Sequence, residues 1–204
     1  MQERVVDEEM RRDYDARAAE YDDWWLGTGL FAERDRPGWP AEVADVIETI
    51  EAMPPSHTLD VACGTGFLTR HLPGEVVALD QSGAMVELAA GRMPGVRVVQ
   101  GDAVPLPFAD GEFERVFTSH FYGHLLESER SAFLAEARRV GRELVVVDSA
   151  LRDDVEPEEW QERELDDGSR HRVYKRFFTP EGLAAELGGG SAIHDGRWFV
   201  AVVA

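Results

Sequence analysis

The chain has 204 residues, and its 40 acidic residues against 21 Lys and Arg give a formal net charge of −19. Such a surface repels nucleic acid and anionic membranes, so we expect neither as a partner. A single cysteine excludes an internal disulfide, and no segment approaches the roughly 18 consecutive apolar residues of a membrane helix. We therefore expect a cytoplasmic protein of one domain, residues 1–204, that is a monomer or a homodimer.

Residues 1–36 are expected to form an N-terminal helix followed by a lid. Apolar and aromatic residues recur there every three or four positions, as one face of a helix requires: Val6, Met10, Tyr14, Ala18 and Tyr21. The segment from Trp24 to Phe31 is too aromatic for an exposed linker and too rich in glycine for a helix, so we expect it to fold over a pocket. Helical spacing returns from Trp39 to Met53 and stops at Pro54 and Pro55.

From residue 56 to residue 149, short apolar strands alternate with helical segments. The strands are expected at about 57–62, 75–80, 96–100, 113–118 and 144–147, and the helices at about 67–72, 82–92 and 128–140. Ser82 is a suitable N-cap for the second of these helices. Strand–helix units repeated in series predict an α/β fold with a doubly wound, mostly parallel sheet.

The C-terminal part of the chain has two different patterns. Residues 150–178 are strongly charged and have no clear period, and we expect them to form an insertion on the substrate side. In residues 179–204, Thr179 and Pro180 begin a helix, and two apolar strands then flank Asp195 and Gly196. This second pattern predicts an antiparallel hairpin, which brings the sheet to seven strands.

The segment between the first strand and the next helix combines an acid with two glycines, Asp60, Gly64 and Gly66. Glycine lets the backbone approach a ligand closely, and a following helix offers free N–H groups. The third small residue of a dinucleotide-binding loop is missing, because position 69 is Thr. A carboxylate near the end of the strand suits an ammonium or a sulfonium better than a pyrophosphate, which argues against NAD.

Four motifs resemble, in order and spacing, those of the class I S-adenosylmethionine-dependent methyltransferases, in particular the small bacterial type 11 branch. They are residues 60–66, 76–80, 101–103 and 113–120, the last followed by His124 and Leu125. The resemblance covers about residues 56–149 and implies a Rossmann-like core that binds the cofactor. It also implies methyl transfer from S-adenosylmethionine to an O, N or C atom of a small-molecule acceptor, with S-adenosylhomocysteine as the product.

The resemblance implies roles for five residues around the adenosine of that cofactor. Asp80 stands at the tip of the second strand, where its carboxylate can accept both ribose hydroxyls; a lone acid there would be a solvent-facing strand end. Asp102 would accept from the adenine amino group, while the N–H of Ala103 meets a ring nitrogen. Gln81 and Met85 would lie against the adenine, although Met85 alone would be ordinary core.

The resemblance also assigns residues to the methionine half of the cofactor. Ala62 and Ser119 would offer backbone carbonyls to the ammonium, with Asp60 assisting directly or through water. Three residues share one face of the N-terminal helix and could close on the carboxylate: Tyr14, Arg17 and Tyr21. Core packing and a surface ion pair would explain these three residues equally well.

Three candidate catalytic residues, His120, Tyr122 and His124, follow the carboxyl end of the fourth strand, where open α/β sheets bind ligands. A sulfonium is already an activated methyl donor, so a base matters only when the acceptor must lose a proton. We take His120 as the first candidate for that base. His124 could instead pack in its helix and donate to a backbone carbonyl. The two histidines have no third ligand nearby in the sequence, so we expect no metal.

Two groups of residues are candidates for binding the acceptor. Trp24 and Trp25 could form an apolar lid over a hydrophobic acceptor, or could close the core against the first helix. Tyr174 lies in a cationic stretch, residues 171–176, which could orient an acidic acceptor. Neutralisation of the nearby glutamates at 156–164 is the alternative explanation for this stretch.

Two other functions share part of these features. A protein that binds S-adenosylmethionine without methyl transfer, as a sensor, a scaffold or a cyclisation catalyst, would contain every motif named above. An NAD-linked reductase shares the sheet and the ribose-binding acid, but it fits Asp60 and Thr69 poorly.

Overall fold

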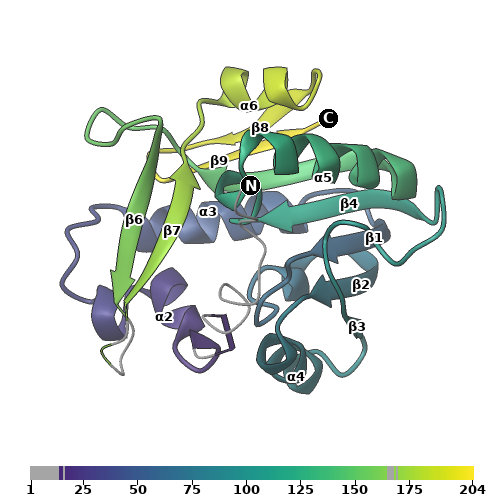
Figure 1. The fold of residues 1–204 in the computed structure, drawn as a ribbon, viewed down its shortest axis with the longest axis horizontal. Helices are drawn as coiled ribbons and strands as arrows, with labels where there is room; N and C mark the ends of the chain where they lie inside the picture. The colour runs from purple at the N-terminus through teal and green to yellow at the C-terminus, as the bar shows by residue number, and fades with distance from the viewer. Residues whose placement is uncertain (1–13, 16, 165–167, 169) are drawn as a thin grey trace.

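The computed structural model describes residues 14, 15, 17–164, 168 and 170–204. The main sheet has seven strands in the order β3-β2-β1-β4-β5-β9-β8 (Figure 1). These strands are β1 Ser56–Val61, β2 Gly74–Asp80, β3 Arg97–Gln100, β4 Phe113–Ser119, β5 Gly141–Ser149, β8 Ser191–Asp195 and β9 Phe199–Val203. Neighbours among β1 to β5 are parallel, whereas β9 is antiparallel to both β5 and β8. The predicted Rossmann-like sheet with a C-terminal antiparallel hairpin is therefore confirmed.

The described helices come in two kinds. The α-helices are α2 Tyr21–Leu26, α3 Trp39–Glu51, α4 Gly83–Arg92, α5 Glu127–Val140 and α6 Pro180–Glu186. Short 3₁₀ helices are η1 Gly29–Phe31, η2 Thr69–His71 and η3 Tyr122–His124. Ser82 and Thr179 cap α4 and α6 as predicted, because their hydroxyl oxygens accept from the backbone N–H of Met85 and Gly182.

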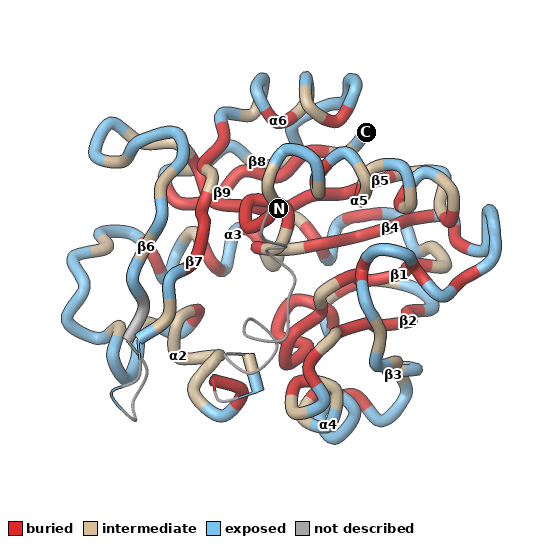
Figure 2. Tube along the Cα trace, viewed as in Figure 1, coloured by how far each residue is buried: buried red, intermediate tan, exposed pale blue. Residues whose placement is uncertain are grey.

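Helices cover both faces of the sheet, as a doubly wound fold requires. Phe133 and Val140 of α5 pack in one core with Val116 of β4, whereas Val46 of α3 packs in another with Phe117. Adjacent residues of a strand point to opposite faces, so α5 and α3 lie on opposite sides of the sheet. Figure 1 shows α5 in front of the sheet and α3 behind it, and in Figure 2 buried residues run along β4, β5 and β9 between these layers.

The strand order fixes where a ligand can bind. From β1 the chain proceeds outward through β2 and β3, and it then returns to place β4 on the other side of β1. The connections that leave the carboxyl ends of β1 and β4 therefore diverge and open a crevice, which is where open α/β sheets bind ligands. The Gly64 turn follows β1, Asp80 ends β2, and Ser119 ends β4.

Two parts of the chain differ from the prediction. Within residues 67–72, which were expected to form a helix, the structure has only the 3₁₀ helix η2, and Pro73, which has no N–H to donate, follows it. Residues 150–178 contain a second antiparallel sheet of two strands, β6 Glu158–Glu164 and β7 Arg170–Arg176. Its register pairs acids with bases, such as Glu159 with Lys175. Charged residues on both strands gave no apolar alternation from which the strands could be predicted.

The N-terminal segment begins, in its described part, beside the carboxyl ends of the strands (Figure 1). Most of the helix expected before residue 22 lies outside the described residues. The following segment was expected to be irregular, but Trp24 and Trp25 lie in α2, which ends at Gly27 with a left-handed φ of 68°. Among the residues that the structure describes, no helix has the length and apolar character needed to cross a bilayer.

Candidate cofactor and acceptor site

The turn after β1 depends on its two glycines. Gly64 and Gly66 have φ of 55° and 81°, which are left-handed values that favour glycine. A Cβ added at Gly66 would lie 2.5 Å from Cε of Met93, and one added at Gly64 would lie 3.2 Å from Cε1 of Tyr21. The turn is fastened to β2, because the N–H of Gly64 donates to Oδ2 of Asp80 at 2.8 Å. A side chain at either glycine would therefore disturb the loop.

Asp80 is a buried acid on a small cavity at the carboxyl ends of the strands. Its Oδ1 accepts from the backbone N–H of Ser82 at 2.9 Å, while Oδ2 accepts from Gly64. Burial raises the pKa of Asp80 to about 6, although hydrogen bonds from the backbone N–H of Ser82, Gly64 and Gln81 act to lower it. Each carboxylate oxygen has two lone pairs, so Asp80 can still accept from two hydroxyls of a ribose.

Asp60 lies deeper than Asp80 and does not line the cavity directly. Its Oδ2 accepts from Oγ1 of Thr69 at 2.6 Å, and its Oδ1 is buried without a hydrogen-bond partner in the described part of the chain. Burial, opposed by the Thr69 bond and reinforced by the charge of Asp80, raises the pKa of Asp60 to about 7. Thr69, which departs from the dinucleotide-binding pattern, thus donates a hydrogen bond to Asp60. A buried carboxylate with an unused oxygen fits a ligand that brings positive charge.

The small cavity collects most of the residues predicted to bind the cofactor. These predicted residues line it: Tyr14, Tyr21, Ala62, Gly64, Asp80, Gln81, Ala103 and Ser119. Other predicted residues do not line it: Asp60, Gly66, Met85, Asp102 and Arg17. Met85 is fully buried and Asp102 is exposed. Sequence reasoning missed Leu79, Phe121 and Leu125, whose only signal was their place beside the motifs at the strand ends.

The N-terminal segment covers this small cavity. Asp22 holds the segment to the cofactor turn, because its two carboxylate oxygens accept from Oγ1 of Thr65 at 2.5 Å and from Arg92 at 2.7 Å. Tyr14 and Tyr21 line the cavity, with their ring centroids 6.3 Å apart. The remaining volume is about 40 Å³, which has room for only a few water molecules. A nucleoside is larger than this space, so residues that line the cavity would have to move to admit one.

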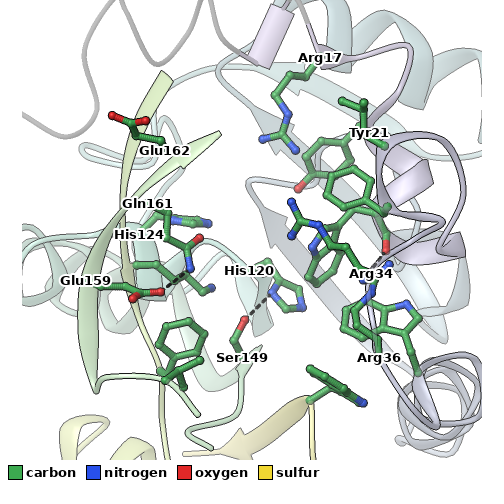
Figure 3. A pocket seen from close by; sticks show the side chains of 18 of the residues that line it. Arg17, Tyr21, Arg34, Arg36, His120, His124, Ser149, Glu159, Gln161 and Glu162 are labelled. Atoms are coloured by element: carbon green, nitrogen blue, oxygen red, sulfur yellow. Dashed lines mark hydrogen bonds between the residues drawn. The ribbon is translucent and has the colours of Figure 1, made fainter. Parts of the chain in front are cut away.

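A larger cavity of about 470 Å³ adjoins the first (Figure 3). One wall comes from α2, η1 and the loop before α3, and the opposite wall comes from β6 and β7. His120 and Ser149 lie between these walls. Four residues line both cavities: Tyr14, Tyr21, His120 and His124. The two cavities therefore meet at the candidate catalytic histidines.

His120 is held in one orientation at this junction. It directly follows β4 and has a left-handed φ of 51°, so the backbone turns away from the strand there. Its ring packs edge-on against the rings of Trp24 and Phe199, with centroids 4.6 Å and 5.4 Å away. Its Nδ1 lies 3.5 Å from Oγ of Ser149 and 3.9 Å from Oδ1 of Asp148. The imidazole thus faces a carboxylate that can stabilise its protonated form.

Asp148, which sequence reasoning missed, is the centre of a buried polar network. Its Oδ1 accepts from Nζ of Lys175 at 2.6 Å and from the N–H of Ser149 at 2.8 Å, and its Oδ2 accepts from the N–H of Gly123 at 2.7 Å. Burial acts to raise the pKa of Asp148, but the charges of Lys175 and then His120, with these hydrogen bonds, hold it below its usual range. Asp148 is therefore ionised at neutral pH.

The structure separates the three predicted catalytic residues. His124 donates from Nδ1 to the carbonyl of Tyr174 at 2.7 Å, which confirms the prediction of a bond to a backbone carbonyl. Tyr122 was expected to face the acceptor, but its ring lies in the core and its hydroxyl donates to Glu186 at 3.5 Å. Burial raises the pKa of Tyr122 further above that of a free phenol. Tyr122 therefore lies in the core and does not face the cavity as expected, whereas His120 lines both cavities.

Of the residues predicted to bind the acceptor, some line the larger cavity and others do not. Trp24 lines the larger cavity, whereas Trp25 lies in the core and stacks on Phe67 with centroids 5.0 Å apart. Tyr174 does not line the cavity. Its hydroxyl donates to Glu158 at 2.6 Å.

The neighbouring cations of the 171–176 stretch are neutralised within the fold. Lys175 pairs with Asp148 at 2.6 Å, and Arg176 pairs with Glu158 and Glu186 at 3.1 Å and 2.5 Å. Arg176 thus pairs with one of the glutamates at 156–164, as the alternative explanation expected, whereas Lys175 pairs with Asp148 at the end of β5. Among the described residues, no three His, Cys, Asp or Glu side chains gather as a metal site would require.

Comparisons with known proteins agree with this geometry. Residues 59–144 match the profile of a family described as "Methyltransferase domain". The demethylmenaquinone methyltransferase of Renibacterium salmoninarum is 37% identical over 109 residues, which cover 50% of this chain and 45% of that relative. The aligned region of this chain therefore spans less than half of the length of this curated relative.

Solved structures extend the likeness to the whole chain. A complex of DhpI with SAM and HEP has a TM-score of 0.79 and 27% sequence identity, and the similarity covers 100% of this chain and 99% of that one. A complex of DhpI with SAH has a TM-score of 0.72 and 26% identity, covering 95% and 93%. With the ordered motifs and the sheet topology, these likenesses show that the chain has the fold of the class I S-adenosylmethionine-dependent methyltransferases and that residues 59–144 match a methyltransferase domain.

Proposed function

We propose that this protein transfers a methyl group from S-adenosylmethionine to an O, N or C atom of a small molecule bound in the larger cavity. One observation carries the proposal: the cavity at the Gly64 turn and the larger cavity meet at His120. An acceptor atom at this junction would lie beside whatever occupies the cofactor cavity, and proximity of this kind supplies much of the rate in transfer reactions. The full-length similarity to DhpI, solved with SAM and with SAH, supports the choice of cofactor.

The residues present fit this cofactor at three points. Asp80 would hold the ribose hydroxyls and the N–H of Ala103 would meet the adenine, while Asp102, which lies outside the cavity, would reach the adenine amino group only after its side chain turns inward. The buried Oδ1 of Asp60, together with the carbonyls of Ala62 and Ser119, would face the ammonium. Arg17, with Tyr14 and Tyr21, is our candidate for the carboxylate. When bound, the cofactor supplies a methyl group already activated on a sulfonium.

The part of the chain in the transfer step is to position the acceptor and to remove its proton. His120 is the proposed base, because its Nδ1 faces the ionised Asp148 and its ring is fixed by Trp24 and Phe199. The positive charge that His120 gains on taking a proton would be stabilised by Asp148, whose own charge is shared with Lys175. Closure of the N-terminal segment over both cavities would exclude water from the step.

Titration calorimetry with S-adenosylhomocysteine tests the cofactor assignment, and release of S-adenosylhomocysteine in the presence of an acceptor tests the transfer. A folded protein that does not bind S-adenosylhomocysteine would refute both. Binding without turnover against a broad metabolite extract would favour the alternative, a cofactor-binding protein that acts as a sensor, a scaffold or a cyclisation catalyst. An NAD-linked reductase would instead bind NAD in competition with S-adenosylhomocysteine.

A further inference from the structure

The N-terminal wall of the larger cavity carries three arginines, Arg17, Arg34 and Arg36, in a chain whose net charge is −19 (Figure 3). Within the described residues, none of these three forms an ion pair with a carboxylate. Lys175, which lines the same cavity, is by contrast paired with Asp148 at 2.6 Å. Glu20 lines the same wall, so three arginines stand against one acid there and a net positive charge remains.

The guanidinium of Arg36 is held in place by its neighbours. It donates from one terminal nitrogen to the carbonyl of Trp24 at 3.1 Å, and its Cζ lies 3.8 Å from the ring centroid of Trp39. The guanidinium of Arg34 lies over the ring of Phe31, with Cζ 4.6 Å from the centroid. Stacking on an aromatic ring leaves the N–H edge of a guanidinium free to donate to a planar or tetrahedral oxyanion. The two arginines are thus arranged as donors.

The three arginines also repel one another. Burial, and then the charge of Arg34, lowers the pKa of Arg36 to about 10. Burial and then the charge of Arg17 lowers the pKa of Arg34 in the same way. Arg34 and Arg36 remain charged at neutral pH, so their mutual repulsion lowers the stability of this wall. An anion bound between the arginines would offset that cost.

The opposite wall of the cavity carries acidic side chains. Glu159 and Glu162 of β6 face the arginines across the cavity, and Glu159 accepts from the side chain of Gln161 at 2.7 Å (Figure 3). An anionic group would be repelled by this wall and attracted by the other. The cavity therefore admits an anion in one orientation, with the remainder of the molecule directed across the space between the walls.

We infer that the acceptor carries an oxyanion, a carboxylate or a phosphate group, which Arg34 and Arg36 bind on the N-terminal wall of the larger cavity. This inference rests on the proposed function, because it names the class of acceptor for the same site. Arg17 lies beside Tyr21, with Cζ 5.6 Å from its ring centroid, and is the candidate for the cofactor's carboxylate. Arg34 and Arg36 are thus the pair assigned to the acceptor.

The test uses the full chain saturated with S-adenosylhomocysteine, titrated with inorganic phosphate and, in a separate arm, with sodium acetate. Sodium chloride keeps the ionic strength constant, and tryptophan fluorescence is the readout, because Arg36 contacts Trp24 and Trp39. We expect a saturable response to at least one probe, and the preferred probe distinguishes phosphate from carboxylate. Arg36→Gln and Arg34→Gln should each raise the midpoint of that response at least tenfold and leave the affinity for S-adenosylhomocysteine unchanged.

Arg70→Gln is the matched control. Its guanidinium stacks on Phe67, with Cζ 4.7 Å from the centroid, but it lines neither cavity. This control removes the same charge and should leave the midpoint unchanged.

No saturable response to either probe, or equal effects of Arg36→Gln and Arg70→Gln, would overturn the inference and leave the proposed function standing. Absence of S-adenosylhomocysteine binding would reject the proposed function itself. Arg34 is exposed, so its variant keeps the test valid should Arg36→Gln not fold.

Discussion

The buried pair of Asp148 and Lys175 gives the sharpest prediction for stability. Both residues are almost inaccessible to solvent, and Oδ1 of Asp148 accepts from Nζ of Lys175 at 2.6 Å. Replacing Asp148 by Asn removes this carboxylate from the buried ammonium, and breaking a buried ion pair typically costs about 3–5 kcal/mol. We expect a loss of about this size in the free energy of unfolding, measured by urea denaturation at neutral pH. A loss below about 1 kcal/mol would refute the assigned pairing.

The double variant separates the pair from general disruption. Asp148→Asn with Lys175→Met removes both charges, so it should recover a large part of the stability lost in Asp148→Asn alone. Asp154→Asn is the control, because Asp154 is exposed and pairs with Arg152 at the surface, and it should cause no measurable loss. A double variant no more stable than Asp148→Asn would indicate that the Asn is disruptive for another reason.

The same pair predicts the direction of a pH effect. The pKa of Asp148 is held below its usual range in the folded protein, so the folded state binds fewer protons than the unfolded state as the pH falls. The stability that this group contributes is present above its unfolded pKa and is lost as the pH falls through the folded value. The difference in stability between the wild type and Asp148→Asn should therefore be largest near neutral pH and should shrink in acid.

The remaining predictions concern the cofactor and the base. Asp80→Ala should weaken S-adenosylhomocysteine binding by about 1.5–3 kcal/mol in calorimetry, because charged hydrogen bonds are lost. That binding should also weaken as the pH is lowered from about 8 to about 5.5, since the raised pKa values of Asp60, about 7, and Asp80, about 6, cause both acids to protonate there. Asp60→Asn should flatten the upper part of this pH profile. His120→Asn, which tolerates the left-handed φ of 51°, should lower turnover of an identified acceptor by about 10²- to 10⁴-fold and retain cofactor binding; unchanged turnover would exclude His120 as the base.

Features that depend on local sequence patterns could be predicted. Asp60, Gly64 and Gly66 mark a turn whose φ values require glycine, and Asp80 follows a short apolar strand. Because the carboxyl ends of parallel strands meet at one edge of a sheet, these residues could be placed together before their contacts were known. The caps at Ser82 and Thr179 are equally local, and both were predicted correctly.

Features that depend on a single backbone angle, or on a contact between residues far apart in the chain, could not be predicted from the sequence. His120 has a left-handed φ, so the direction of the next side chains no longer follows the alternation of β4, and Tyr122 points into the core. Lys175 is 27 residues from Asp148 in the chain, and their charges meet because β7 packs against η3, whose Gly123 N–H also donates to Asp148. Arg34 and Arg36 lie in a loop without any period, so nothing in their spacing indicated a shared wall.

The N-terminal segment links the two halves of the site. Tyr14 and Tyr21 line both cavities, and Asp22 fastens the same segment to Thr65 in the cofactor turn and to Arg92 on α4. Any movement of these tyrosines would therefore also change one wall of the larger cavity. Since Arg34 and Arg36 follow on the same stretch of chain, one segment contributes to the proposed cofactor site and to the proposed acceptor site.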